Sequence, residues 1–249
     1  PVRRLSPLAR VGWIHAAWTA VKYGVYHYWS IHHMVSRASG RTWENLGLIL
    51  SDRPATVAGV FTRNRVQAAP VRLCRERVRG GVCRAVVANS GNANCCTGDA
   101  GWHNALRMAR TVALGVDAPE EQVLVASTGV IGEPLPVERV EQAVPELVRR
   151  LAPEGLADFA EAIMTTDRVP KGLSRQGRID GKTFTLTGVV KGAGMIRPDV
   201  ATMLCFIVTD AAVGAGELQA ALAAGADRSF NCITVDGDTS TNDTILLMA

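Results

Sequence analysis

The sequence predicts an α+β fold in which sheets and helices pack in layers. Apolar, β-branched runs typical of buried strands are interspersed with longer stretches of helical periodicity, and the two kinds follow each other without strict alternation. No internal repeat is apparent. The 249 residues are 47% apolar and 20% charged, which is typical of a soluble globular chain long enough for a substantial core.

Residues 1–42 differ in composition from the rest of the chain, since they hold all three tyrosines and four of the five histidines. Apolar residues spaced like one face of a helix occur at Ile14, Trp18, Val21, Val25 and Trp29. This pattern favours either an amphipathic helix that docks on a partner or a membrane surface, or a segment that does not belong to the fold. The adjacent His32 and His33 are not expected to bind a metal.

Regular structure is expected from residue 46 onward. Residues 46–50 and 56–61 predict two strands, and the Ser-Asp-Arg-Pro sequence at 51–54 predicts a turn between them. Residues 82–88 predict a third strand, which ends in the polar run 89–94. That run is either a ligand loop or a hydrogen-bonded structural turn. Asp99 is expected to cap a helix over residues 100–114.

The middle of the chain predicts another strand at residues 122–126, which ends in the small, polar run 127–132. Two helices are expected next, at residues 137–151 and 156–164. Later elements are strands at 183–190 and 203–208 and a helix at 216–224.

A dense polar run follows that helix. Residues 230–243 predict a strand that leads into a polar loop, and residues 244–248 form a last apolar run. With nothing after this run to pack it, we expect the domain to be incomplete.

Charge and cysteine content exclude several classes of protein. The net charge of +4 is small, and the arginines at positions 72, 75, 77 and 79 indicate a solvated face rather than a nucleic-acid site. None of the six cysteines forms a Cys-x-x-Cys pair, which argues against zinc and for a reduced, cytoplasmic setting. No apolar run is long enough to span a membrane, and no signal peptide is recognisable.

The stretch from Lys191 to Leu204 is the strongest candidate for chemistry. Two glycines and a Pro-Asp pair precede Ala201-Thr202, which stands where a loop enters the apolar run 203–208. A small residue followed by threonine at such a junction is a pattern of self-cleaving proteins. The hydroxyl of Thr202 can attack the preceding carbonyl, and the freed α-amine, titrating near pH ~8, can then act as its base. Taken alone, the same pattern fits an ordinary threonine at the start of a strand.

Several motifs together resemble the bifunctional glutamate/ornithine N-acetyltransferases of arginine biosynthesis. The motifs with the highest specificity for this family are Gly-Met-Ile-Arg-Pro-Asp-Val-Ala-Thr-Met-Leu at 194–204 and the polar run 231–243. Further matches stand, in family order, at residues 51–54, 58–64, 68–71, 89–98, 127–132, 165–167 and 170–171. The resemblance covers residues 44–249 in all.

The resemblance implies a self-processing enzyme with a four-layer α/β/β/α fold. Its chain would cleave between Ala201 and Thr202 into an α-chain part, residues 43–201, and a β-chain that begins at residue 202. Thr202 would then carry an acetyl group from N-acetylornithine to glutamate. Thr128, by its hydroxyl, and Gly129, by its backbone N–H, match the pair that stabilises the oxyanion.

Thr165 and Lys191 match substrate-binding positions of the same family, and a lysine suits the α-carboxylate of glutamate and ornithine derivatives. The family implies no metal and no organic cofactor, although some members also accept acetyl-CoA as the donor. It further implies that the two cleaved chains stay together, as a heterotetramer, without nucleic-acid or membrane partners.

Two departures leave alternatives open. Residues 1–42 do not match the family, and family members continue well past the position of Ala249, so we expect this chain, with residues 202–249 as the start of its β-chain, to be partial. One alternative is an inactive, truncated remnant of the enzyme. Another is a related self-processing amidohydrolase or aminopeptidase, which would hydrolyse amides without transfer to glutamate.

Overall fold

A computed structural model describes residues 29–35, 45–196 and 203–249 of the chain, and eight strands and five α-helices lie in these ranges. The strands are β1 (Trp29–Val35), β2 (Asn45–Phe61), β3 (Val82–Asn92), β4 (Val123–Val130), β5 (Lys171–Ile179), β6 (Lys182–Lys191), β7 (Leu204–Thr209) and β8 (Thr244–Met248). The helices are α2 (Ala69–Arg77), α3 (Gly98–Gly115), α4 (Val137–Arg149), α5 (Leu156–Ala162) and α6 (Ala215–Asp227). Short 3₁₀ turns follow α2, precede β4 and follow α6.

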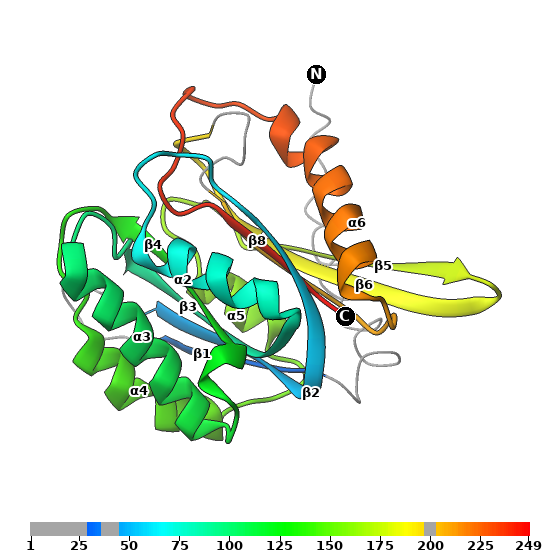
Figure 1. Ribbon diagram of the computed structural model, residues 1–249, viewed down its shortest axis with the longest axis horizontal. Helices are drawn as coiled ribbons and strands as arrows, with labels where there is room; N and C mark the ends of the chain where they lie inside the picture. Colours follow the sequence, from blue (N-terminus) through cyan, green and yellow to red (C-terminus); the bar gives the residue numbers. More distant parts are fainter. Residues whose placement is uncertain (1–28, 36–44, 197–202) are drawn as a thin grey trace.

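All the strands belong to one mixed sheet, in the order β4-β3-β2-β8-β7-β6-β5, with β1 paired to β2 outside this path (Figure 1). The strand β2 joins its two halves. Residues 45–51 of β2 pair with β1 and β3, and residues 57–61 pair with β8. We call the first group of strands (β1, β3, β4 and the start of β2) the A half, and the second (the end of β2 with β8, β7, β6 and β5) the B half.

The prediction of a turn at residues 51–54 is wrong, because β2 runs through this stretch as an extended strand. Its register against β3 shifts between Leu50 and Ala55. Pro54 has no N–H to donate to a ladder, so a bulge is one of the few places in a sheet that accept it. The proline therefore marks a register shift within β2, not a point where the chain reverses.

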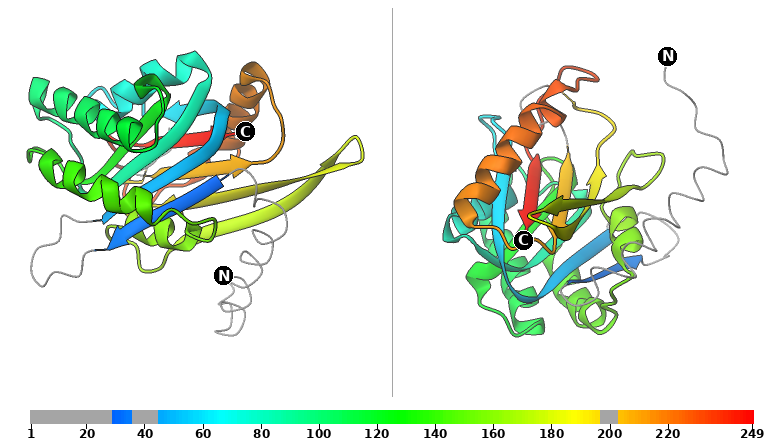
Figure 2. Two further views of the ribbon diagram at one scale, coloured as in Figure 1. Left: turned by 90° about the horizontal axis from the view of Figure 1, so that it is seen from below. Right: turned by 90° about the vertical axis from the view of Figure 1, so that its right-hand side faces the viewer.

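The order of layers is α/β/β/α. The helices α2, α3 and α4 lie beside the A half, while α6 packs on the outer face of the B half (Figures 1 and 2). Leu218 and Leu222 of α6 are buried in a cluster with Ala58, Ile245 and Leu247 of the B half. The largest cluster combines core residues of both halves and of the helices α2 to α5. The predicted α+β class and its layering are thus confirmed.

Phe159 of α5 connects the two halves directly. Its ring lies so close to Gly47 of β2 that a Cβ at position 47 would be 2.5 Å from it. The same ring meets Phe206 of β7 edge-on, with 5.2 Å between ring centroids. A glycine in a strand often marks such a close approach, so Gly47 admits the ring that links the A half to the B half.

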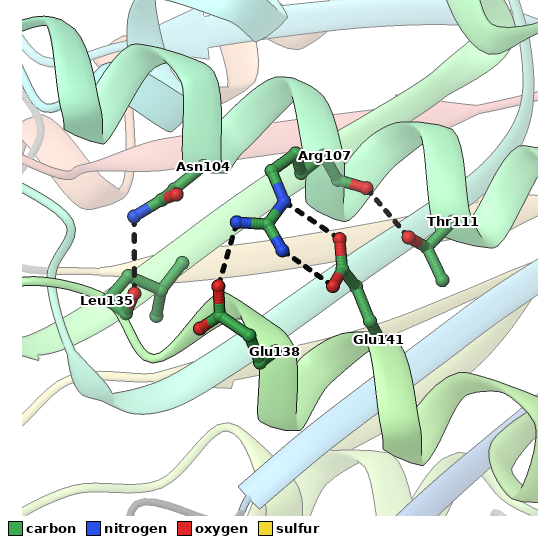
Figure 3. A network of polar contacts seen from close by, with 6 residues as sticks. All are labelled: Asn104, Arg107, Thr111, Leu135, Glu138 and Glu141. Carbon is green, nitrogen blue, oxygen red and sulfur yellow. Dashed lines mark hydrogen bonds and ion pairs between the residues drawn. The ribbon is translucent and has the colours of Figure 1, made fainter.

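Helices α3 and α4 are joined on their exposed side by a single arginine (Figure 3). Arg107 of α3 makes a two-bond contact with Glu141 of α4, at 2.9 and 2.7 Å, and a third bond to Glu138 at 2.8 Å. The paired geometry fixes the relative rotation of the two helices more than it stabilises them, because exposed ion pairs contribute little.

Three further expectations differ from the structure. Residues 230–243 hold a 3₁₀ turn at Phe230–Cys232 and then irregular chain, not a strand. The strand β5 lies in a stretch for which no element was predicted. The apolar run 244–248 does not lack packing: it is β8, buried between β2 and β7.

The amphipathic helix considered for residues 14–29 lies outside the described residues, apart from Trp29. That residue begins β1, whose backbone pairs antiparallel with β2. A strand of the sheet therefore stands inside the segment 1–42.

Candidate active site

The polar residues at the ends of β3 and β4 lie side by side. Because the two strands are parallel, Ser90 pairs with Thr128 and Gly91 with Gly129. Their polar side chains are buried and bonded to other parts of the chain: Ser127 Oγ donates to Asn89 Oδ1 at 2.6 Å. Asn94 Nδ2 donates to the carbonyl of Gly101 at 2.9 Å. These bonds favour the structural interpretation of residues 89–94, in which the run holds the strand ends in place.

Gly129 occupies a position that only glycine fits. Its φ of +136° lies in a region that other residues rarely adopt. A Cβ there would lie 2.2 Å from the carbonyl carbon of Gly91. The two glycines thus allow the ends of β3 and β4 to approach, with the Thr128–Gly129 peptide at the edge of the sheet.

Lys191 brings three of the predicted site residues together. It is the last residue of β6 and is only 2% exposed. Its Nζ donates to Thr165 Oγ1 at 2.7 Å and to Thr128 Oγ1 at 3.1 Å. Thr165 comes from the loop after α5 and Thr128 from β4, so one ammonium group joins three separate elements. Lys191 is not a solvent-exposed lysine, and Thr128 is more than a turn residue.

The charge of Lys191 is balanced by neighbouring carboxylates. Burial lowers the pKa of Lys191, and the charge of Asp167 opposes that effect without cancelling it. For Asp167, burial would raise the pKa, but an ion pair with Lys171 and a 2.8 Å bond from the Gly192 N–H outweigh burial and lower it. The candidate site therefore holds a carboxylate, two lysines and two hydroxyls within one connected network.

Asp243, in the run that leads into β8, is a site residue that the sequence did not single out. It is fully buried, and its Oδ1 accepts the backbone N–H of Met203 at 2.8 Å. Its Oδ2 has no hydrogen-bond partner among the described residues. Burial raises the pKa of Asp243 to about 8, against the Met203 N–H bond and the charge of Lys191. The one sequence feature that pointed toward Asp243 is that the run 231–243 contains aspartates and no other charged residue.

The same polar run also holds the chain before residue 197. Asp236 accepts the backbone N–H groups of Met195 and of Ile196, the latter at 2.8 Å. The carbonyl of Ile196 accepts in turn from Val235 N at 2.8 Å. Ile196 and Met203 are thus both anchored by the run 231–243, on either side of residues 197–202. Ala201 and Thr202 lie in that interval, outside the described residues.

Two features absent from the described part of the chain bear on its binding partners. Within it, no group of three or more His, Cys, Asp or Glu side chains is arranged to hold a metal ion. Nor do the described ranges contain a helix that is both long and apolar enough to cross a membrane.

Comparison with known proteins points to one family. A model of the ArgJ family matches residues 31–249. The arginine biosynthesis bifunctional protein ArgJ of Geobacter sulfurreducens is 54% identical over 205 residues, which are 82% of this chain and 52% of that protein. The chain thus spans about half the length of the curated relatives it matches.

Two solved structures are also similar. The arginine biosynthesis bifunctional protein ArgJ from Bacillus halodurans is 38% identical with a TM-score of 0.64, over 71% of this chain and 91% of that one. An ornithine acetyltransferase from Mycobacterium tuberculosis, crystallised with ornithine, is 33% identical with a TM-score of 0.59, over 71% of this chain and 92% of that one.

Proposed function

Since this chain belongs to the ArgJ family, we propose that the protein is an acetyltransferase of arginine biosynthesis. It moves an acetyl group from N-acetylornithine to glutamate through an ester on Thr202. The proposal includes self-cleavage between Ala201 and Thr202, after which the two pieces remain associated. It needs no metal or organic cofactor, and acetyl-CoA is a possible second donor.

The chemistry proceeds in two stages. In the first, Thr202 Oγ1 attacks the acetyl carbonyl of N-acetylornithine, its proton passes through the freed α-amine of Thr202 to the leaving amine, and ornithine departs. In the second, the amine of glutamate attacks the acetyl ester, and Thr202 leaves with its proton restored. Both stages pass through a tetrahedral oxyanion, which needs donors placed in advance.

The observation that carries the proposal is the pair of bonds from Lys191 Nζ to Thr128 and Thr165. A threonine hydroxyl has one hydrogen to donate and two lone pairs. Because Thr128 accepts from Lys191, its own hydrogen is left for an oxyanion, with the Gly129 N–H as the second donor. The 2% exposure of Lys191 supports this orienting role more than direct contact with a substrate carboxylate.

The cleavage step is supported by the anchoring of both sides of residues 197–202. Met203 N, the amide nitrogen of the peptide bond to Thr202, donates to Asp243 Oδ1 at 2.8 Å. The carbonyl of Met203 accepts from Thr244 N at 3.0 Å. A chain held at such points can keep a hydroxyl close to the carbonyl that it attacks, and this closeness is the largest contribution to many intramolecular reactions.

The test follows labelled acetyl from N-acetylornithine to glutamate and records the intact mass of the chain at neutral pH. Thr202→Ala should show neither transfer nor cleavage, whereas Thr202→Ser should keep part of both, because only a methyl group is lost. Transfer by Thr202→Ala would disprove the assignment of the nucleophile. Acetyl released to water, with none on glutamate, would support the amidohydrolase alternative, and no reaction by the parent chain would support an inactive remnant.

A further inference from the structure

Two neighbouring cysteines stand beside the candidate active site and take no part in the proposed reaction. The sulfur atoms of Cys95 and Cys96 are 3.7 Å apart. The side chains differ sharply in exposure: Cys95 is 1% exposed and packs with Ala68, Val71 and Ala93, while Cys96 is exposed. One accessible thiol with a second, shielded thiol next to it is the arrangement of a redox-sensitive pair.

The backbone around the pair is fixed in an uncommon shape. Cys96 has a φ of 59° and Asn94 a φ of 45°, both in the left-handed region. The Cys95 carbonyl accepts the Gly132 N–H at 2.9 Å, which ties it to the loop after β4. Cys96 also lines a surface cavity of about 610 Å³, together with Arg65 and Arg72. A small oxidant can therefore reach the Cys96 sulfur, while the backbone keeps that of Cys95 nearby.

We propose that Cys95 and Cys96 form a peroxide-sensitive dithiol, in which Cys96 is oxidised first and Cys95 then closes a disulfide. In the first step the Cys96 sulfur attacks a hydroperoxide, the O–O bond breaks, a sulfenic acid forms and an alcohol or water leaves. In the second step the Cys95 sulfur attacks the Cys96 sulfur, the S–O bond breaks and water leaves. The peroxide is reduced by two electrons, and the pair of thiols is oxidised by two.

The environment of Cys95 supports this order. Burial raises the pKa of Cys95, so it is the poorer nucleophile toward an oxidant in solvent, but it needs no access to solvent in order to attack its neighbour. Adjacent Cα atoms are about 3.8 Å apart, closer than in most disulfides, and the sulfurs must approach by roughly 1.6 Å. The disulfide is therefore strained, and mild reductants should open it readily.

The pair is in contact with residues of the candidate site. Thr241 opposes the rise in the pKa of the Cys95 thiol, which places Thr241 near that thiol. The Thr241 hydroxyl donates to Asn242 Oδ1 at 2.6 Å. Asn242 Nδ2 donates to the carbonyl of Ser127 at 2.8 Å, directly before Thr128. A disulfide would draw the Cys95 sulfur toward that of Cys96, from which it is 3.7 Å away, and so change its position beside Thr241.

The experiment treats the reduced, whole chain with hydrogen peroxide, alkylates the free thiols and digests it with trypsin. The peptide 85–107, between Arg84 and Arg107, contains Cys95 and Cys96 and no other cysteine. It should be lighter by two hydrogens and unalkylated, and dithiothreitol should restore two alkylation sites. Both cysteines alkylated after peroxide, or Cys96 driven to sulfinic acid with Cys95 free, would overturn the proposal.

Variants separate the two steps. Cys96→Ser should leave Cys95 reduced, and Cys95→Ala should stop at a sulfenic acid on Cys96, which dimedone traps. Cys232, the other exposed cysteine of the described chain, provides the matched control, and Cys232→Ser should form the disulfide as before.

A probe that needs no variant is phenylarsine oxide, which binds two neighbouring thiols at once. One equivalent should protect both cysteines of the peptide 85–107 from alkylation. Failure to protect them would contradict the close placement of the two sulfurs.

Discussion

Lys191 and Asp243 are buried titratable residues of the candidate site, and each depends on a few specific partners. A buried ammonium is costly unless hydrogen-bond acceptors and opposite charges surround it. Lys191 has two hydroxyl acceptors and lies in the field of Asp167 and Asp243. Its role therefore depends on the hydroxyl groups as much as on its own charge.

The Thr128 hydroxyl is the proposed donor to the oxyanion, and it can be removed without changing the shape of the side chain. Thr128→Val keeps the shape of the side chain but removes the proposed oxyanion donor, so the rate of acetyl transfer should fall by about 10²- to 10³-fold. Lys191 keeps its hydrogen bond to Thr165, so the variant should remain folded. Thr166→Val is the matched control, because Thr166 is exposed and next to Thr165 in the chain. Steady-state rates of labelled glutamate formation measure both, and equal rates would remove Thr128 from the mechanism.

The second prediction concerns Asp243 and pH. Its pKa is about 8 in the folded protein and about 3.9 in an unfolded chain. Between these values the folded state binds the extra proton, so the free energy of unfolding falls as the pH rises from about 4 to about 8. Asp243→Asn removes this titration and keeps an acceptor for Met203 N. Relative to the variant, the parent should lose up to about 1.4 kcal/mol per pH unit, measured by urea unfolding.

Asp236→Asn is the control for that experiment. Hydrogen bonds from backbone N–H groups, that of Met195 first, lower the pKa of Asp236, so this carboxylate stays ionised across the whole window. Its substitution should leave the pH dependence between about pH 5 and about pH 8 unchanged. Parallel pH profiles for the parent and Asp243→Asn would show that Asp243 does not titrate there.

The sequence, through its resemblance to a family, predicted part of this site. Thr128, Thr165 and Lys191 were found through a family pattern, and the structure places them in one hydrogen-bonded group. Asp243 was missed because burial and a raised pKa arise from packing between β2, β7 and β8. No local pattern records such packing. The run 231–243 contains several carboxylates, and only the fold distinguishes the fully buried Asp243 from the exposed Asp236.

At the scale of elements, the site depends on how closely β3 and β4 approach at their ends. Gly129→Ala should distort this approach, because its Cβ would overlap the backbone of Gly91 at 2.2 Å and its φ is +136°. We expect a loss of at least about 2 kcal/mol in unfolding free energy and loss of acetyl transfer.

Gly132→Ala gives the matched comparison. It also has a positive φ, of +87°, but a Cβ there meets no atom within 4 Å. It should cost only about 1 kcal/mol of backbone strain. Urea midpoints rank the two variants, and equal midpoints would mean that the contact with Gly91 does not matter.

Elements were predicted well where their burial is one-sided or complete, and poorly elsewhere. The apolar runs that became β4, β6 and β7 are unambiguous in the sequence. The strand β5 was missed because its residues are mostly exposed and polar, and its ladder with β6 holds it in place. Residues 51–54 contain turn residues, yet β2 continues through them because its two ends pair with different halves of the sheet.

In the whole molecule, Phe159 is one of the side chains that pack the A half against the B half. It is fully buried, beneath Gly47 and against Phe206. Phe159→Ala should lower the unfolding free energy by about 3 to 5 kcal/mol, from lost burial and the cavity left behind. Leu114→Ala, at a position that is 78% exposed, should change it by less than about 0.5 kcal/mol. Thermal unfolding measures both, and a small effect at Phe159 would mean that the halves are held together elsewhere.

The place of β7 and β8 in the sheet has a consequence for a chain broken after residue 201. Both strands belong to the shorter piece, yet β7 pairs with β6 over six residues and β8 pairs with β2 over five. Helix α6 of that piece packs against Ala58 of β2 through apolar contacts. The shorter piece would thus supply two central strands of the sheet, with strands of the longer piece paired on both sides of them. A gel in detergent would resolve two bands, while a sizing column without denaturant would return one particle.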